Sequence, residues 1–185
     1  MTQYVPGGRR RIDRVLAPTF LEGLAEMDLQ QIRDRRADAD QEEADLSYAR
    51  RLLQGRIDLL RAEESSRAGD GPLSRAPRSD SEIVDALARI LADGPRRDRG
   101  LGRHLTCSPS RVGEHRREAE RAVADVGGTD TSMSDEELRS AIGHLTDIEQ
   151  RVSRSRRSVQ IVVDTLTEEI ARRYRAGEVP ALSVT

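Results

Sequence analysis

The sequence of 185 residues contains no lysine and no tryptophan, and it has only one cysteine, Cys107. A single cysteine cannot form a disulfide within the chain, which fits a reducing compartment. No stretch approaches the roughly 18 apolar residues of a membrane span, and no apolar run follows the arginines near the amino terminus as in a signal peptide. We therefore expect a cytoplasmic protein without a membrane partner.

Aromatic residues are scarce at 2%, whereas 36% of the residues are hydrophobic and 35% are charged. This composition is too polar for a large compact core and is typical of elongated helices with a narrow apolar seam. All 31 basic residues are arginine, whose planar fork suits phosphate, carboxylate and guanine edges. The net charge of −2 argues against a general nucleic-acid binder, so we expect no direct contact with DNA.

Hydrophobic periodicity predicts an all-α chain, because helical spacing recurs and no strand pattern of comparable quality exists. Capping-box spacing occurs at Thr19–Glu22, Ser79–Glu82 and Ser134–Glu137. We expect a flexible arm (1–18), a first long helical region (19–67) with a possible break near Asp28, a connection with short helices (68–133), a second long helix (134–176) and a tail (177–185). Two long helices with apolar seams predict an antiparallel coiled-coil hairpin, with short satellite helices in the connection.

The two long helices carry the same polar motif, E-x3-S-x2-R-x3-Q-x3-D, at an offset of 106 residues. The first copy is Glu43, Ser47, Arg50, Gln54 and Asp58, and the second is Glu149, Ser153, Arg156, Gln160 and Asp164. At about 100° per residue, the five side chains of a copy fall within an arc of roughly 80°. The matched apolar residues fall on the adjoining arc, and they are Leu46 with Val152, Leu53 with Val159, Ile57 with Val163, and Leu60 with Leu166.

The residue types of the motif suit a guanine nucleotide. Arginine can donate two hydrogen bonds to O6 and N7 of guanine, and a carboxylate can accept from its N1 and N2 hydrogens. Serine and glutamine can bond phosphate or ribose oxygens. The glutamate can steer the arginine, within its own helix or across the pair, or it can touch the ligand itself. Matching stripes on antiparallel helices are related by a pseudo-two-fold axis, and cyclic di-GMP is a ligand with that symmetry.

The duplicated motif resembles that of the RsiG anti-sigma factors of filamentous actinobacteria, and all ten motif positions agree. The resemblance implies two antiparallel coiled-coil helices that bind cyclic di-GMP, as a dimer, through these ten residues. It also implies a sigma-factor partner of the WhiG class, a flagellar-type sigma factor of late sporulation genes, which the protein would sequester. Candidate contacts for that partner are Phe20, Leu21 and Leu24, or the short helix around Val84 and Leu87.

Other interpretations compete with a nucleotide-dependent anti-sigma factor. The stripes alone could be solvated helix faces, and the chain a coiled-coil adaptor without a ligand. A segment from Ser110 to Val126 could belong to a DNA-binding regulator, although a DNA reader usually has more basic character. His104, Cys107 and His115 are too few for a recognisable metal site. No acidic pair accompanies a nucleophile or a phosphate-binding loop, so we expect neither an enzyme nor a catalytic cofactor.

Overall fold

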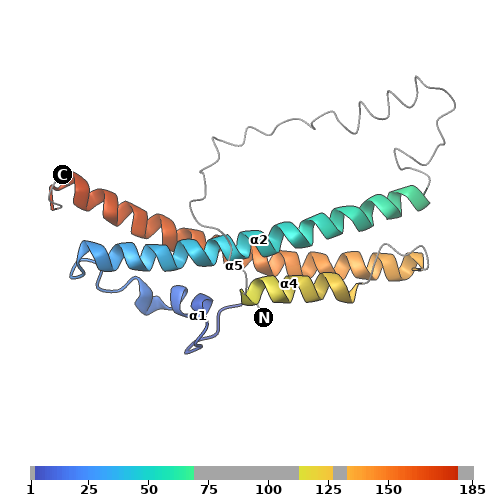
Figure 1. The fold of residues 1–185 in the computed structure, drawn as a ribbon, viewed down its shortest axis with the longest axis horizontal. Helices are drawn as coiled ribbons and strands as arrows, with labels where there is room; N and C mark the ends of the chain where they lie inside the picture. Colours follow the sequence, from blue (N-terminus) through green and yellow to red (C-terminus); the bar gives the residue numbers. More distant parts are fainter. Residues whose placement is uncertain (1–2, 69–112, 127–132, 179–185) are drawn as a thin grey trace, which may run out of the picture.

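The computed structural model describes residues 3–68, 113–126 and 133–178, and every regular element in these ranges is a helix. In chain order the elements are α1 (Arg11–Val15), the 3₁₀ helix η1 (Pro18–Phe20), α2 (Leu29–Arg67), α4 (Glu114–Asp125) and α5 (Asp135–Arg175) (Figure 1). The all-α prediction is confirmed for the described residues. No helix among them is long and apolar enough to cross a membrane.

The long helix α2 begins at Leu29, not at Thr19. Asp28 is its N-cap and forms a capping box with Gln31, with hydrogen bonds of 2.7 and 2.9 Å. Thr19 lies in η1, so the capping box that we predicted there is wrong. The physical reason is Gly23, whose φ of +68° is left-handed and interrupts a helix. The break expected near Asp28 is therefore the helix start itself.

The second long helix, α5, begins as the sequence predicts. The Ser134 hydroxyl accepts a hydrogen bond from the Glu137 amide at 3.3 Å, and the Glu137 carboxylate accepts one from the Ser134 amide at 2.7 Å. These bonds satisfy two of the amides that a helix start leaves without partners. The helix ends before Gly177, which takes a left-handed φ of +69°.

The helices α2 and α5 pack along their lengths and run in opposite directions (Figure 1). At one end Arg67 donates to the Met133 carbonyl, and at the other Arg33 donates to the Tyr174 hydroxyl. All eight matched apolar residues of the two seams are 5% exposed or less, so they form the core as predicted. Burial of these seams holds the pair together, since the rest of each helix surface is strongly polar.

The amino-terminal segment is not the loose arm that we expected. Ile12 and Val15 of α1 are each 1% exposed and belong to the same hydrophobic core as the long helices. Asp13, also buried, accepts hydrogen bonds from the Val5 amide at 2.8 Å and from Arg10. Two apolar residues within five are too few to show a helical period, so this packing could not be read from the sequence.

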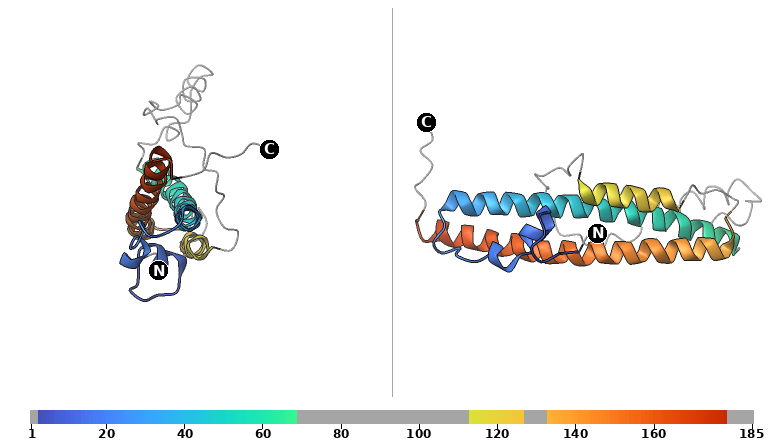
Figure 2. Two further views of the ribbon diagram at one scale, coloured as in Figure 1. Left: turned by 90° about the vertical axis from the view of Figure 1, so that its left-hand side faces the viewer. Right: turned by 90° about the horizontal axis from the view of Figure 1, so that it is seen from below.

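The short helix α4 packs against α2, on the same side of the helix pair as α1 (Figure 2). Short helices were expected in the connection (68–133), and α4 confirms one of them. Residues 69–112 lie outside the described ranges. These residues include the helix expected after Ser79, with Val84 and Leu87, and both His104 and Cys107.

Candidate ligand-binding site

The two motif copies meet across the middle of the α2–α5 pair. Leu46 and Val152, the matched apolar residues at this point, are 0% and 1% exposed. Because α2 and α5 are antiparallel and carry the same motif, a rotation of 180° places each motif copy on the other. An axis that exchanges two antiparallel helices is normal to the plane that contains both. The two polar stripes therefore emerge on the same face of the pair.

Each copy reaches across to the other through an arginine and a glutamate. Arg156 of α5 donates from Nη1 to Oε1 of Glu43 on α2 at 3.0 Å. The symmetry-related pair, Arg50 Nη1 and Glu149 Oε1, is separated by 3.6 Å. Of the two roles that the sequence left open for the glutamate in steering an arginine, the structure shows the cross-helix one.

A serine holds each of these glutamates from within its own helix. The Ser47 hydroxyl donates to Oε1 of Glu43 at 2.8 Å, and the Ser153 hydroxyl donates to Oε1 of Glu149 at the same distance. A spacing of four residues places serine and glutamate one above the other on a helix face. The glutamate, serine and arginine positions of both copies thus form two equivalent clusters around one axis.

Exposure divides the clusters into a lower and an upper layer. The side chains of Glu43 and Glu149 are 10% and 18% exposed, whereas those of Arg156 and Arg50 are 33% and 36% exposed. The carboxylates therefore lie deeper, and the guanidinium groups lie nearer the solvent. An anion approaching this face would meet arginines first.

The glutamine and aspartate of each copy lie farther from the axis. Arg50 donates to the Gln54 side chain at 3.0 Å, and Gln160 donates to Asp164 at 3.1 Å. Asp58 and Asp164 are both exposed. At 1.5 Å per residue, each aspartate lies about 17 Å along the pair from the axis, in opposite directions. The structure thus gathers six motif residues at the centre and places four toward the ends.

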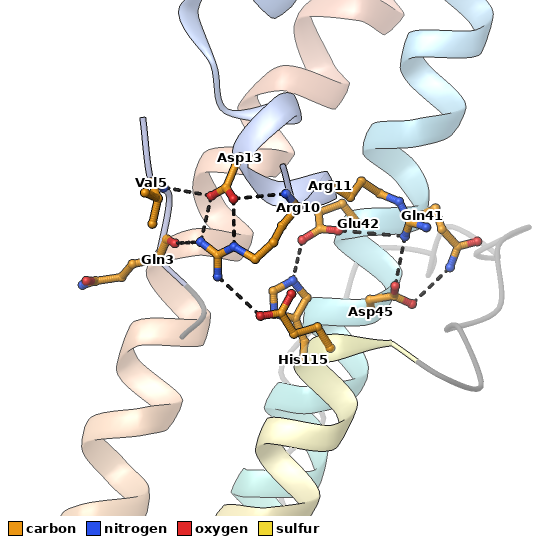
Figure 3. A network of polar contacts seen from close by, with 10 residues as sticks. Gln3, Val5, Arg10, Arg11, Asp13, Gln41, Glu42, Asp45 and His115 are labelled. Carbon is orange, nitrogen blue, oxygen red and sulfur yellow. Dashed lines mark hydrogen bonds and ion pairs between the residues drawn. The ribbon is translucent and has the colours of Figure 1, made fainter. Parts of the chain in front are cut away.

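A second polar cluster, which the sequence did not reveal, joins α1, α2 and α4 (Figure 3). At about 100° per residue, its α2 residues lie on the side of the buried seam away from the motif stripe. His115 of α4 contacts Glu42 of α2 at 2.5 Å through Nε2, and Arg11 of α1 donates to Asp45 of α2 at 3.1 Å. Arg10 lies 3.6 Å from Glu114 and so joins α1 to α4. These contacts form between elements that are far apart in the sequence. Residue spacing within one element therefore could not predict them.

The central clusters can bind an anionic, hydrogen-bonding ligand. Nε of Arg156 is buried and has no hydrogen-bond partner among the described residues, whereas the Arg156 side chain as a whole is 33% exposed and so can meet a ligand from the solvent side. Arginine donors together with carboxylate acceptors match guanine edges and phosphate. Among the described residues no three histidine, cysteine or acidic side chains are placed to hold a metal ion.

Comparison with known protein families gives a match over much of the chain. A family model described as RsiG-like matches residues 18–91 and 128–184, which include both motif copies. The match leaves out α1 and α4. No curated protein matches the chain.

Proposed function

This chain belongs to the RsiG-like family, and we propose that it is an anti-sigma factor that holds its sigma factor in response to cyclic di-GMP. The family indicates the anti-sigma role and a sigma-factor partner, and hence a regulatory protein. The dependence on cyclic di-GMP, the ten motif residues as its binding site, and a partner of the WhiG class belong to our proposal. The observation that carries it is the pair of equivalent clusters on one face of the helix pair.

The symmetry of this face supports a symmetric ligand. The arginine–glutamate–serine clusters are related by an axis normal to the helix pair, and a cyclic dinucleotide has its own two-fold axis. Arg50 and Arg156 would meet the phosphates or the O6 and N7 edges of guanine, where an arginine fork gives bidentate contacts. Asp58 and Asp164, both exposed, would accept from guanine N1 and N2.

The length of the stripes supports two bound nucleotides. Asp58 and Asp164 lie about 35 Å apart along the pair at 1.5 Å per residue, which exceeds the reach of one cyclic dinucleotide. Two molecules side by side would cover both stripes, and guanine stacking between them would replace the aromatic platforms that this chain lacks. We therefore propose that cyclic di-GMP binds as a dimer.

The bound nucleotide would change the affinity for sigma by linkage. The helix pair is narrow, and its motif face carries charged groups that a protein partner would have to desolvate. Nucleotide would pair with these groups and complete one continuous surface for sigma. A ligand that prefers the sigma-bound form shifts binding toward that form by its differential affinity. The chain would then sequester its sigma factor when cyclic di-GMP is abundant.

A calorimetric titration of the full chain with cyclic di-GMP tests the site. We expect saturable binding of two nucleotides per chain, and a loss of at least about tenfold in affinity for Arg50→Ala, since it removes charge-assisted hydrogen bonds. Arg154→Ala is the matched control, because Arg154 is exposed on α5 outside the motif. No binding by the wild type, or an equal loss in the control, would contradict the proposal.

A further inference from the structure

We infer that the two motif copies work as two composite units, in which the glutamate and serine of one helix position the arginine of the other. One unit is Glu43 and Ser47 of α2 with Arg156 of α5. The other is Glu149 and Ser153 of α5 with Arg50 of α2. Neither helix therefore carries a complete half-site. This inference rests on the proposed function for its ligand, and it assigns distinct roles within that site.

Within each unit, the serine contacts the glutamate and the glutamate contacts the arginine. Serine donates to Oε1 of the glutamate below it, and the same oxygen meets Nη1 of the arginine from the other helix. The serine hydroxyl restricts the rotamer of the carboxylate, and the carboxylate restricts the long arginine side chain. Since arginine otherwise loses much rotamer freedom on binding, this restriction lowers the entropic cost of engaging a ligand.

The glutamate engages only one corner of the guanidinium group. Both cross-helix pairs use Nη1, so a single amino group of each arginine is occupied by the partner helix. A guanidinium has five donor hydrogens in a fixed fork. The Arg156 and Arg50 side chains are also 33% and 36% exposed, so each is partly open to the solvent. A ligand acceptor can therefore be added to an arginine that the glutamate continues to hold.

The depth of the glutamates supports the same assignment. Glu43 and Glu149 lie beneath the arginines, with side chains 10% and 18% exposed. A carboxylate in this layer repels an anionic ligand unless a guanidinium stands between the two. We therefore assign Glu43 and Glu149 as positioning residues and the two arginines as the groups that meet the nucleotide.

Substitutions of Glu43 test the positioning role through the affinity of the full chain for cyclic di-GMP. Glu43→Ala should weaken binding of cyclic di-GMP about tenfold, because Arg156 loses the carboxylate that positions it. Glu43→Gln keeps an acceptor for Arg156 and should stay within about threefold of the wild type. An equal loss in both variants would mean that the carboxylate itself binds guanine. Tighter binding in either variant would mean that Glu43 competes with the ligand. Both results would overturn the assignment.

A double-mutant cycle without nucleotide tests the cross-helix pairing independently. In the ligand-free chain, Glu43→Ala should change the unfolding equilibrium constant about threefold more when Arg156 is present than in an Arg156→Ala background. The matched cycle with Arg50, from the same motif copy as Glu43, should show no such coupling. Coupling to Arg50 and not to Arg156 would overturn the inference. If the wild type fails to bind cyclic di-GMP, the proposed function fails, while this cycle still decides whether the units are composite.

Discussion

At the scale of single residues, the polar contacts of the site join residues that lie far apart in the sequence. Glu43 and Arg156 are 113 positions apart and share a hydrogen bond of 3.0 Å. Glu42, the residue before Glu43, faces the other side of the buried seam and contacts His115. Since successive residues on a helix are rotated by about 100°, two neighbouring glutamates serve two unrelated clusters.

Arginine partners hold the pKa of two carboxyl groups well below their usual range. The hydrogen bond from Arg10 lowers the pKa of Asp13 from 3.8 to about 2, and Arg172 with Arg173 lowers that of Glu169 from 4.5 to about 2. Arg173 also donates to the Met27 carbonyl at 2.6 Å, so Glu169 helps to hold the segment before α2. The Glu169–Arg173 pair therefore attaches the amino-terminal segment to α5, whereas the Asp13–Arg10 pair holds that segment in its own fold.

These lowered pKa values predict an acid-sensitive fold. A carboxyl group whose pKa is depressed in the folded state adds stability above its unfolded pKa, and this stability disappears as pH falls through the folded pKa. For Asp13 and Glu169 the loss should run from about pH 4.5 down to about pH 2. Urea unfolding at a series of pH values measures it. Asp13→Asn should lower the stability at pH 7 and flatten the acid-side slope; an unchanged slope would contradict this account.

At the scale of elements, features that depend on local residue spacing could be predicted from the sequence. Contacts between distant segments could not. The Ser134–Glu137 capping box and the eight seam residues follow from spacing alone, because helical period and cap chemistry act within a few residues. The packing of α1 and the partner of each motif arginine depend on how distant segments align. The sequence predicted that a pseudo-two-fold axis relates the two stripes, but it could not choose between an intrahelical and a cross-helix arginine pair.

The start of α2 gives a direct test at this scale. Asp28→Ala removes the N-cap hydrogen bond to the Gln31 amide and should destabilise the chain by about 1 kcal/mol. Thr19→Ala is the matched control, because Thr19 is exposed in η1 and caps no α-helix. Thermal unfolding compares the two variants. A larger loss for Thr19→Ala than for Asp28→Ala would restore the earlier helix start.

The supercoil of the predicted coiled coil stays a prediction.

The molecule as a whole has two different long sides. One carries both polar stripes, and no other described element covers their exposed residues. The other receives α1 and α4, which contact Glu42 and Asp45 of α2 through charged groups (Figures 2 and 3). The residues matched by the family model include the helix pair and leave out both short helices. The elements outside the family match thus occupy the side opposite the motif.

The proposed function depends most on whether the nucleotide controls the affinity of the chain for a sigma factor. The direct measurement is the dissociation constant between the full chain and a WhiG-class sigma factor, determined with increasing cyclic di-GMP and repeated for Arg50→Ala. We predict that nucleotide tightens the wild-type complex by at least about tenfold, a coupling near 1.4 kcal/mol, and that the variant responds little. A wild-type complex of the same affinity with and without cyclic di-GMP would contradict the account.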